Sequence, residues 1–124
     1  MAGERILIIE DNPLNMELAQ DLLEAWGYKV HGASTAQEGI EIARLEKPDL
    51  VLMDIQLPGM DGLTATRLLR KDSSLAGLKI IALTAHAMKG DDQKVLEAGC
   101  NGYISKPIDT RQFSRQIAAF LDSK

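Results

Sequence analysis

Short apolar runs alternate with longer stretches of helical periodicity along the whole chain. The first, third and fourth runs are rich in Ile, Val and Leu without polar alternation, which is typical of strands buried on both faces of a parallel sheet. The other two runs are less apolar but continue the same alternation. The five predicted strands are Ile6–Ile9, Tyr28–Ala33, Leu50–Met53, Ile80–Leu83 and Gly102–Ser105.

Helical patterns follow the runs, and their apolar residues recur every three or four positions. In the first of them, the residues that line one face are Leu14, Leu18, Leu22 and Ala25. The other four helices are indicated by Ala36, Ile40 and Ala43, by Leu63, Thr66, Leu68 and Leu69, by Val95 and Leu96, and by Phe113, Ile117, Phe120 and Leu121.

Five strand-then-helix units in series predict an α/β fold. The expected architecture is a doubly wound, five-stranded parallel sheet with right-handed crossovers and helices on both faces. In open sheets of this kind, ligands bind beyond the carboxyl ends of the strands, near the point where the strand order reverses. Candidate chemistry is therefore sought first at those strand ends.

Candidate metal-binding and phosphoryl-contacting residues directly follow four of the five predicted strands. Glu10 and Asp11 follow the first run, Asp54 follows the third, Thr84 follows the fourth, and Lys106 follows the fifth. Because the carboxyl ends of parallel strands share one edge of the sheet, we expect these side chains to meet in one pocket.

Such a pocket has a chemical logic. Three crowded carboxylates repel one another and attract a cation, and an oxygen-only site with room for waters suits Mg²⁺, or alternatively Mn²⁺. The metal would hold a phosphoryl donor, while an aspartate carboxylate can attack phosphorus and form an acyl phosphate. Lys106 would contact one phosphoryl oxygen as a mobile cation, and the Thr84 hydroxyl would donate to another.

Four segments carry a family resemblance. They are IIEDN (Ile8–Asn12), DLVLMDIQLPGMDG (Asp49–Gly62), IIALTAHA (Ile80–Ala87) and GYISKPI (Gly102–Ile108). With these segments in this order, the chain resembles the CheY-like receiver domains of response regulators nearly end to end. Among receivers it is most similar to stand-alone DivK-type regulators and to receivers attached to hybrid histidine kinases.

The resemblance implies a strand order of 2-1-3-4-5 and assigns roles to single residues. It implies that Asp54 is the phosphoacceptor, that Glu10 and Asp11 are the acidic metal-binding pair, and that the Gln56 backbone carbonyl is a further metal ligand. It implies that Thr84 and Tyr103 form a coupled switch pair. It implies that Lys106 contacts the phosphoryl group and precedes a cis peptide bond to Pro107. It also implies that Gln56 and His86 tune the phosphoryl lifetime.

The implied function is a phosphorelay switch in two-component signal transduction, rather than an enzyme with external substrates. Phosphorylation would be self-catalysed and dephosphorylation slow. A histidine kinase or a histidine phosphotransfer protein would supply the phosphoryl group. The surface of the fourth helix, fifth strand and fifth helix would then change its binding to a downstream protein target.

The residues give weaker support to other functions. A Mg²⁺-dependent phosphatase usually needs a second Asp as general acid two residues after its nucleophile, where this chain has Gln56. A flavodoxin-like carrier would need a phosphate loop where the chain has acidic EDNPLN. A receiver that binds without phosphorylation typically lacks one of the acids, the Thr or the Lys. A receiver excised from a hybrid histidine kinase remains an alternative.

Composition narrows the setting. The 124 residues fit a single receiver domain, 1–124, without an output domain. The net charge of -4 disfavours nucleic acid as a direct partner. Cys100 is the only cysteine, which suits a cytoplasmic location, and no apolar run is long enough to cross a membrane. We expect a monomer, with dimerisation through the last helices as the alternative.

Overall fold

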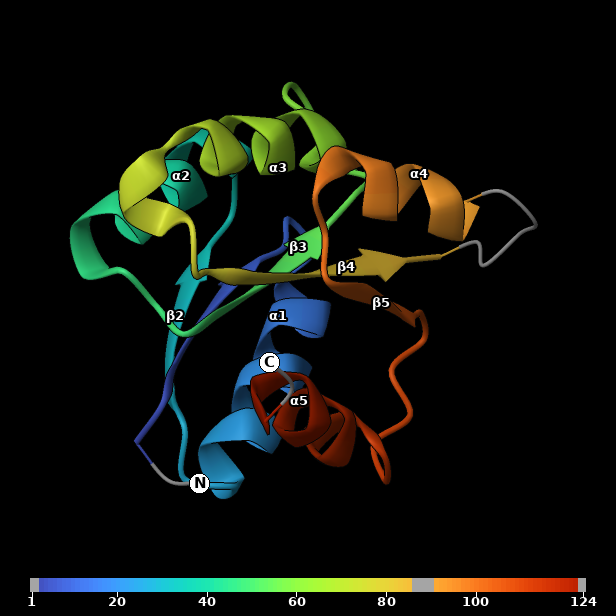
Figure 1. The fold of residues 1–124 in the computed structure, drawn as a ribbon. Coiled ribbons are helices and arrows are strands. Elements are labelled where there is room, and N and C mark those ends of the chain that lie inside the picture. Colours follow the sequence, from blue (N-terminus) through green and yellow to red (C-terminus); the bar gives the residue numbers. More distant parts are fainter. Residues whose placement is uncertain (1–2, 86–90, 123–124) are drawn as a thin grey trace.

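One sheet of five parallel strands forms the centre of the computed structural model, which describes residues 3–85 and 91–122 (Figure 1). The strand order β2-β1-β3-β4-β5 confirms the order that the resemblance implies. Each strand lies within one residue of its predicted bounds, and Asp54 and Thr84 are the last residues of their strands. The strands are β1 (Arg5–Ile9), β2 (Lys29–Ala33), β3 (Leu50–Asp54), β4 (Lys79–Thr84) and β5 (Gly102–Ser105).

The described helices cover both faces of the sheet, as expected for a doubly wound fold (Figure 1). On one face lie α2 (Ala36–Glu46), α3 (Gly62–Lys71) and α4 (Asp91–Ala98). On the other lie α1 (Pro13–Ala25) and α5 (Phe113–Asp122). Alternate strand residues supply the two buried clusters, for example Leu7, Val51 and Ile80 under the first group and Ile6, Leu52 and Ile81 under the second.

The strand register aligns the carboxyl ends of the central strands. Ile9 of β1 pairs with Met53 of β3, one residue before the acids at each strand end. Asp54 in turn pairs with Leu83 of β4, next to Thr84. This alignment places residues from three separate strands at one edge of the sheet, where the sequence predicts chemistry.

The start of α1 is fixed by its cap. The Asn12 Oδ1 accepts the backbone N–H groups of Leu14 at 2.9 Å and Asn15 at 3.2 Å, and Pro13 occupies the first turn. These are two of the donors that a helix start leaves without partners, and proline lacks a third. The connection from β1 into α1 is therefore short and well held, directly beside Glu10 and Asp11.

The buried face of α1 differs from the apolar stripe seen in the sequence. Leu14 is 77% exposed and Leu18 is 39% exposed, whereas Ala19 and Leu23 are buried and Met16 packs against them. Apolar residues cover more than half of the circumference of this helix, so periodicity alone does not decide which part of that surface faces the sheet. Of the predicted stripe, Leu14 and Leu18 face outward, whereas Leu22 is partly buried and packs against the core.

The helices are short relative to a lipid bilayer. The longest, α1, has 13 residues, whereas a membrane span needs about 20 apolar residues. Within residues 3–85 and 91–122, no helix has both the length and the apolar character that a span requires.

Candidate functional site

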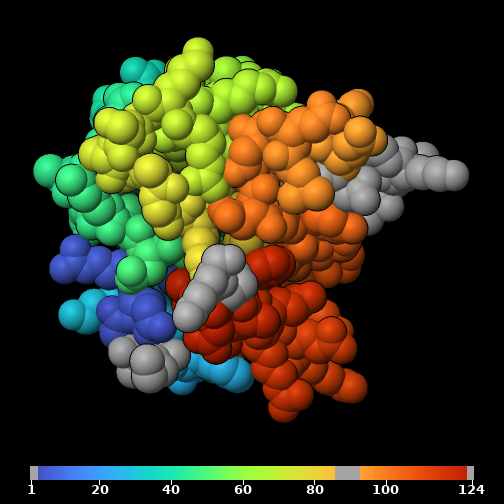
Figure 2. Space-filling view, viewed as in Figure 1, coloured from blue at the N-terminus to red at the C-terminus, as the bar shows by residue number. Residues whose placement is uncertain are grey.

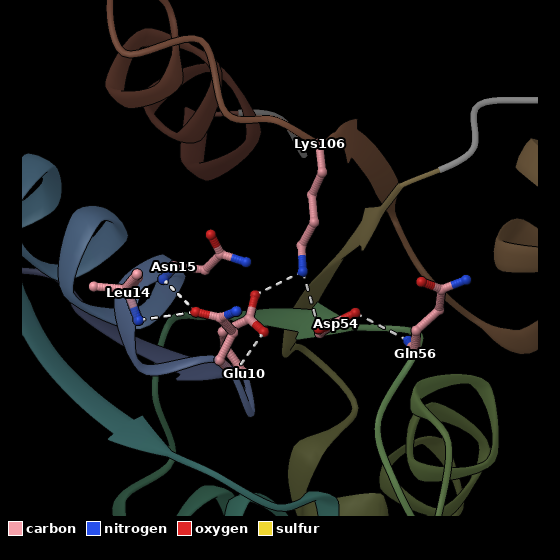
Figure 3. Close-up of polar contacts among 7 residues, drawn as sticks. Glu10, Leu14, Asn15, Asp54, Gln56 and Lys106 are labelled. Atoms are coloured by element: carbon pink, nitrogen blue, oxygen red, sulfur yellow. Dashed lines mark hydrogen bonds and ion pairs between the residues drawn. The ribbon is translucent and has the colours of Figure 1, made fainter.

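Asp54 ends the central strand β3 with its side chain buried, and the residue is 3% exposed. The Ile55 N–H donates to the Leu83 carbonyl at 3.2 Å, so pairing with β4 continues just past the strand end. The Gln56 N–H donates to Asp54 Oδ1 at 2.9 Å, and Lys106 Nζ donates to Oδ2 at 3.0 Å. Both carboxylate oxygens therefore have a positioned donor (Figure 3).

Two further acids follow β1 and lie beside Asp54. Glu10 is 2% exposed, its N–H donates to the Ala33 carbonyl at 3.0 Å, and Asp11 is exposed. One carboxylate oxygen from each of Glu10, Asp11 and Asp54 lies within 4.8 Å of the other two. Among the described residues, this is the one acidic group of three with metal-binding spacing. The three acids predicted to share a pocket therefore do so.

Lys106 reaches across the pocket from the end of β5 and joins two of the acids (Figure 3). Its Nζ lies 2.7 Å from Glu10 Oε1 and 3.0 Å from Asp54 Oδ2. Its backbone N–H donates to the Thr84 carbonyl at 2.7 Å, which ties the start of the following loop to the end of β4. The Lys106–Pro107 peptide bond is cis.

Burial and mutual pairing shape the ionisation of this cluster. Burial raises the pKa of Glu10, and the neighbouring Asp54 adds to the increase, while the bond from Lys106 opposes it. Burial lowers the pKa of Lys106, but its hydrogen bonds to Glu10 and Asp54 outweigh this effect and leave the pKa raised. The lysine is therefore a firmly charged partner for carboxylates that are crowded and partly desolvated.

The residues present fit a divalent cation. Glu10 Oε1 is buried and, apart from its ion pair with Lys106, has no hydrogen bond of good geometry. The cluster offers oxygen ligands alone, with no sulfur or imidazole among its members. Hard cations such as Mg²⁺ prefer this donor set, and an exposed acid on one side leaves space for the waters that Mg²⁺ retains.

The remaining predicted site residues lie around this centre. Thr84 is buried at the end of β4, and Gln56 is exposed in the loop after β3. Tyr103 lies on β5, pairs with Ala82 in register and is 37% exposed. Figure 2 shows α4, in orange, directly against the darker orange chain of β5 on the same face of the molecule. His86 lies outside the described residues.

A groove beside the lysine was not predicted from the sequence. It encloses about 380 Å³ between the start of α1 and the loop after β5, and Leu18 is exposed at its side. The sequence carries no signal for this groove, because the outward direction of Leu18 becomes known only from the structure. Its lining residues are Asn15, Leu18, Ala85, Lys106, Pro107 and Ile108.

Curated relatives are similar to the chain over most of its length. The polar-differentiation response regulator DivK of Brucella anthropi is 46% identical over 116 residues, which are 94% of this chain and 94% of that protein. DivK of Brucella abortus matches to the same extent. The identity is high enough, and the coverage complete enough, to show a family relationship rather than a fold likeness alone.

Solved structures agree with this relationship. The receiver domain of a sensor histidine kinase from Pseudomonas aeruginosa, determined with a magnesium ion coordinated in its active-site cleft, is 36% identical with a TM-score of 0.89. The match covers 98% of this chain and 100% of that one. Chemotaxis response regulator CheY4 of Vibrio cholerae, at 20% identity, a TM-score of 0.91 and coverage of 96% and 99%, shares the fold.

A sequence family also matches nearly the whole chain, including the residues at the strand ends. The sequence family described as the response regulator receiver domain matches residues 6–118, which include every described residue of the acidic cluster and Lys106. Receivers of this family are signalling switches that work with histidine kinases or phosphotransfer proteins and bind Mg²⁺ at an acidic pocket. The chain belongs to the response regulator receiver domain family and is similar to DivK within it.

Proposed function

We propose that the chain accepts a phosphoryl group on Asp54 from a protein-borne phosphohistidine. An oxygen of the Asp54 carboxylate forms a bond to phosphorus while the bond from phosphorus to the donor's imidazole nitrogen breaks. The electron pair of that bond stays with the imidazole, and the product is an acyl phosphate on Asp54. The observation that carries the proposal is the buried Asp54 carboxylate held between two acids and the Lys106 ammonium.

Each neighbour has a part in this transfer. Bound Mg²⁺ would supply positive charge to the phosphoryl oxygens during transfer. Glu10, Asp11, Asp54 and the Gln56 carbonyl would hold it. Lys106 now bridges Glu10 and Asp54 and would move one of its hydrogen bonds onto a phosphoryl oxygen.

Slow loss of the phosphoryl group follows from what lies after Asp54. The side chain two residues later is the Gln56 amide, which can neither give nor take a proton as a general acid or base. Water attacking the acyl phosphate therefore lacks the partner that a fast phosphatase provides. We assign Gln56 and His86 the role of setting the lifetime of the phosphoryl group.

The output would pass through Thr84 and Tyr103. Thr84 ends β4 next to the phosphoacceptor, and Tyr103 lies on the neighbouring strand with its ring partly exposed. If Thr84 turns its hydroxyl toward the phosphoryl group, the space it leaves admits the Tyr103 ring. This shifts an existing two-state equilibrium and changes the surface of α4, β5 and α5 that binds the downstream target.

The groove beside Lys106 supports a protein as the donor. Leu14 and Leu18 expose apolar surface on α1, and the groove floor continues through Pro107 and Ile108 toward Lys106. Exposed apolar surface next to a buried reactive group favours a macromolecular partner, because it costs free energy in water and is covered on docking. A small donor would not need the exposed surface of Leu14 and Leu18.

Turnover separates this switch from a phosphatase. The chain is incubated with Mg²⁺ and either phosphoramidate, a small donor with a phosphorus–nitrogen bond, or p-nitrophenyl phosphate, and released phosphate is measured. The proposal predicts at most one phosphoryl group per chain, retained over many minutes with the first donor, and no sustained release from the second. Continuous release from both compounds, abolished by Asp54→Asn, would instead identify a phosphatase.

One observation favours a second context for the same chemistry. The Pseudomonas receiver that matches 98% of this chain is part of a sensor histidine kinase, whereas DivK is a response regulator matched over 94% of its own length. A receiver of a hybrid kinase would accept its phosphoryl group from the kinase to which it is attached. A single band of the chain's own mass in extracts of its source, detected with an antibody, supports the stand-alone form, and a much larger band supports the hybrid kinase.

A further inference from the structure

The first residue of α3 lies against the backbone that carries Asp54. A Cβ atom at Gly62 would lie 2.3 Å from the Asp54 carbonyl oxygen and 2.7 Å from the Ile55 Cα. Both are backbone atoms, so no rotation of a side chain relieves the contact, and either the helix start or the strand end has to move. In the present arrangement, the Gly62 N–H donates to the Ile55 carbonyl at 3.2 Å.

The contact at Gly62 differs from those at other crowded glycines. At Gly39 and Gly102, an added Cβ would meet the side chains of Ile9 and Phe120, which can change rotamer. At Gly77, nothing lies within 4 Å of the added atom. Gly62 is not among the glycines with positive φ, so its missing side chain, and not an unusual backbone conformation, is what the structure uses.

The close approach fixes the loop that holds the Asp54 carboxylate. Residues 55–61 leave β3 and return at Gly62, whose bond to Ile55 closes the base of the loop. Within it, the Gln56 N–H donates to Asp54 Oδ1 at 2.9 Å (Figure 3). Moving the start of α3 by the distance that a Cβ requires would carry Ile55 and then Gln56 with it.

We infer that Gly62 is a positioning residue for the phosphoacceptor site, because only a residue without a Cβ lets α3 hold the Gln56 main chain against Asp54. The inference rests on the proposed function in one respect, since it takes the Gln56 carbonyl as a metal ligand. Helix propensity argues for the opposite effect of a substitution, because Ala stabilises a helix relative to Gly. Helix propensity alone therefore predicts that Gly62→Ala is stabilising, whereas the close backbone contact predicts that it disturbs the site.

The test compares Gly62→Ala with two matched variants, Gly77→Ala in open space and Gly102→Ala against a side chain. Amide NMR spectra of metal-free protein, recorded well below the melting temperature, report the Gln56 N–H. A Mg²⁺ titration of the same samples gives the dissociation constant of the folded protein. We expect Gly62→Ala to shift the Gln56 amide and to weaken Mg²⁺ binding at least about tenfold, in the range seen for residues that orient metal ligands. The two control variants should keep the wild-type dissociation constant.

The outcomes separate this inference from the proposed function. A Gly62→Ala protein that melts earlier but binds Mg²⁺ within twofold of wild type, with the Gln56 amide unmoved, would show a merely structural glycine and overturn the inference. A wild type that binds no Mg²⁺ contradicts the proposed function, whereas a shifted Gln56 amide in the variant would still support the positioning role.

A measurement on the wild type covers the case in which Gly62→Ala does not fold. If the bond from Gly62 to Ile55 holds the loop that carries a metal ligand, we expect Mg²⁺ to slow hydrogen exchange of the Gly62 N–H, because metal binding stabilises the closed form of that loop over its opened form. Exchange at Gly77 serves as the internal control. An unchanged Gly62 exchange rate at saturating Mg²⁺ would overturn the inference.

Discussion

Lys106 Nζ lies 2.7 Å from Glu10 Oε1, and the same ammonium lies 3.0 Å from Asp54 Oδ2. One cation from the end of β5 therefore joins acids from the ends of β1 and β3. Without a bound cation, Lys106 is the positive charge that offsets repulsion between the two buried carboxylates. This relationship links the stability of the metal-free protein to the residues proposed for phosphoryl transfer.

Substituting Lys106 should weaken the metal-free fold and increase its response to Mg²⁺. Lys106→Ala leaves Glu10 and Asp54 buried without a cation, and we expect a loss of roughly 1–3 kcal/mol in the free energy of unfolding, which is below the full cost of breaking a buried pair because the lysine is partly exposed. Urea unfolding with and without Mg²⁺ measures both effects. Lys94→Ala, at an exposed position of α4, is the control. Equal Mg²⁺ stabilisation of wild type and Lys106→Ala would contradict the bridging role.

The same variant tests the signalling role of the lysine. Phosphorylated Lys106→Ala should retain Mg²⁺ but fail to change its partner-binding surface. Amide NMR spectra of α4 and β5, recorded with and without the phosphoryl group, make the comparison. A spectral change as large as that of the wild type would show that Lys106 does not carry the coupling.

Glu10 should contribute to the pH dependence of the stability of the metal-free protein. Its folded-state pKa lies above the ordinary value of 4.5 because the group is buried, so the folded protein binds the proton more tightly than the unfolded chain. This contribution to stability is present below pH 4.5 and is lost as the pH rises through the raised pKa. Glu10→Gln should remove that decline and stabilise the metal-free protein near neutral pH. Thermal melts from pH 4 to pH 8 without Mg²⁺ check this, and parallel curves for the two proteins would refute it.

The outward leucines of α1 should matter for a protein donor and not for a small one. We expect Leu14→Ala with Leu18→Ala to slow transfer from a phosphorylated histidine phosphotransfer protein by about tenfold, as loss of one or two apolar contacts on docking would. The rate with acetyl phosphate should stay unchanged. Leu45→Ala is a matched control, because Leu45 is 82% exposed on α2 across the sheet. Equal slowing with both donors would point to damage at the site itself.

Arg70 of α3 forms a clamp of hydrogen bonds to the chain beside α4, and the clamp should contribute to stability. The Arg70 guanidinium donates to the carbonyls of Gly99 at 2.8 Å and Leu78 at 2.6 Å, and to Asn101 Oδ1 at 2.7 Å. Arg70→Met removes a donor from both carbonyls, while Asn101 Oδ1 keeps the Ile80 N–H. The variant should therefore cost about 1–3 kcal/mol of unfolding free energy. Arg67→Met, on an exposed position of the same helix, should be near neutral. Denaturant midpoints of both variants decide this, and equal midpoints would show that the clamp adds nothing.

The sequence predicts much of the site because strand ends converge by topology. Asp54, Glu10 and Lys106 are adjacent in space for the reason that made them candidates: each ends or follows a strand of one parallel sheet. The rotation of α1, which turns Leu14 outward, could not be predicted from the sequence in the same way. Its apolar residues cover more than half of the circumference, so the direction that Leu14 faces depends on the tertiary connection.

Gly62 marks another limit of reading a sequence. A glycine at the start of a helix has several ordinary explanations, and nothing in the order of residues shows that α3 will approach the Asp54 carbonyl. That distance arises from how β3 and α3 pack, and it becomes visible only in three dimensions. Close backbone contacts are therefore invisible to periodicity and motif, although they set the geometry of the site.

The central claim is that Asp54 holds the phosphoryl group, and intact mass spectrometry tests it most directly. Wild type, Asp54→Asn and Asp11→Asn are incubated with Mg²⁺ and acetyl phosphate, and each mass is recorded before and after reaction. We expect a single phosphoryl addition to the wild type, none to Asp54→Asn, and a reduced but detectable addition to Asp11→Asn at high Mg²⁺. A phosphoryl addition that persists in full in Asp54→Asn would show that Asp54 does not hold the phosphoryl group.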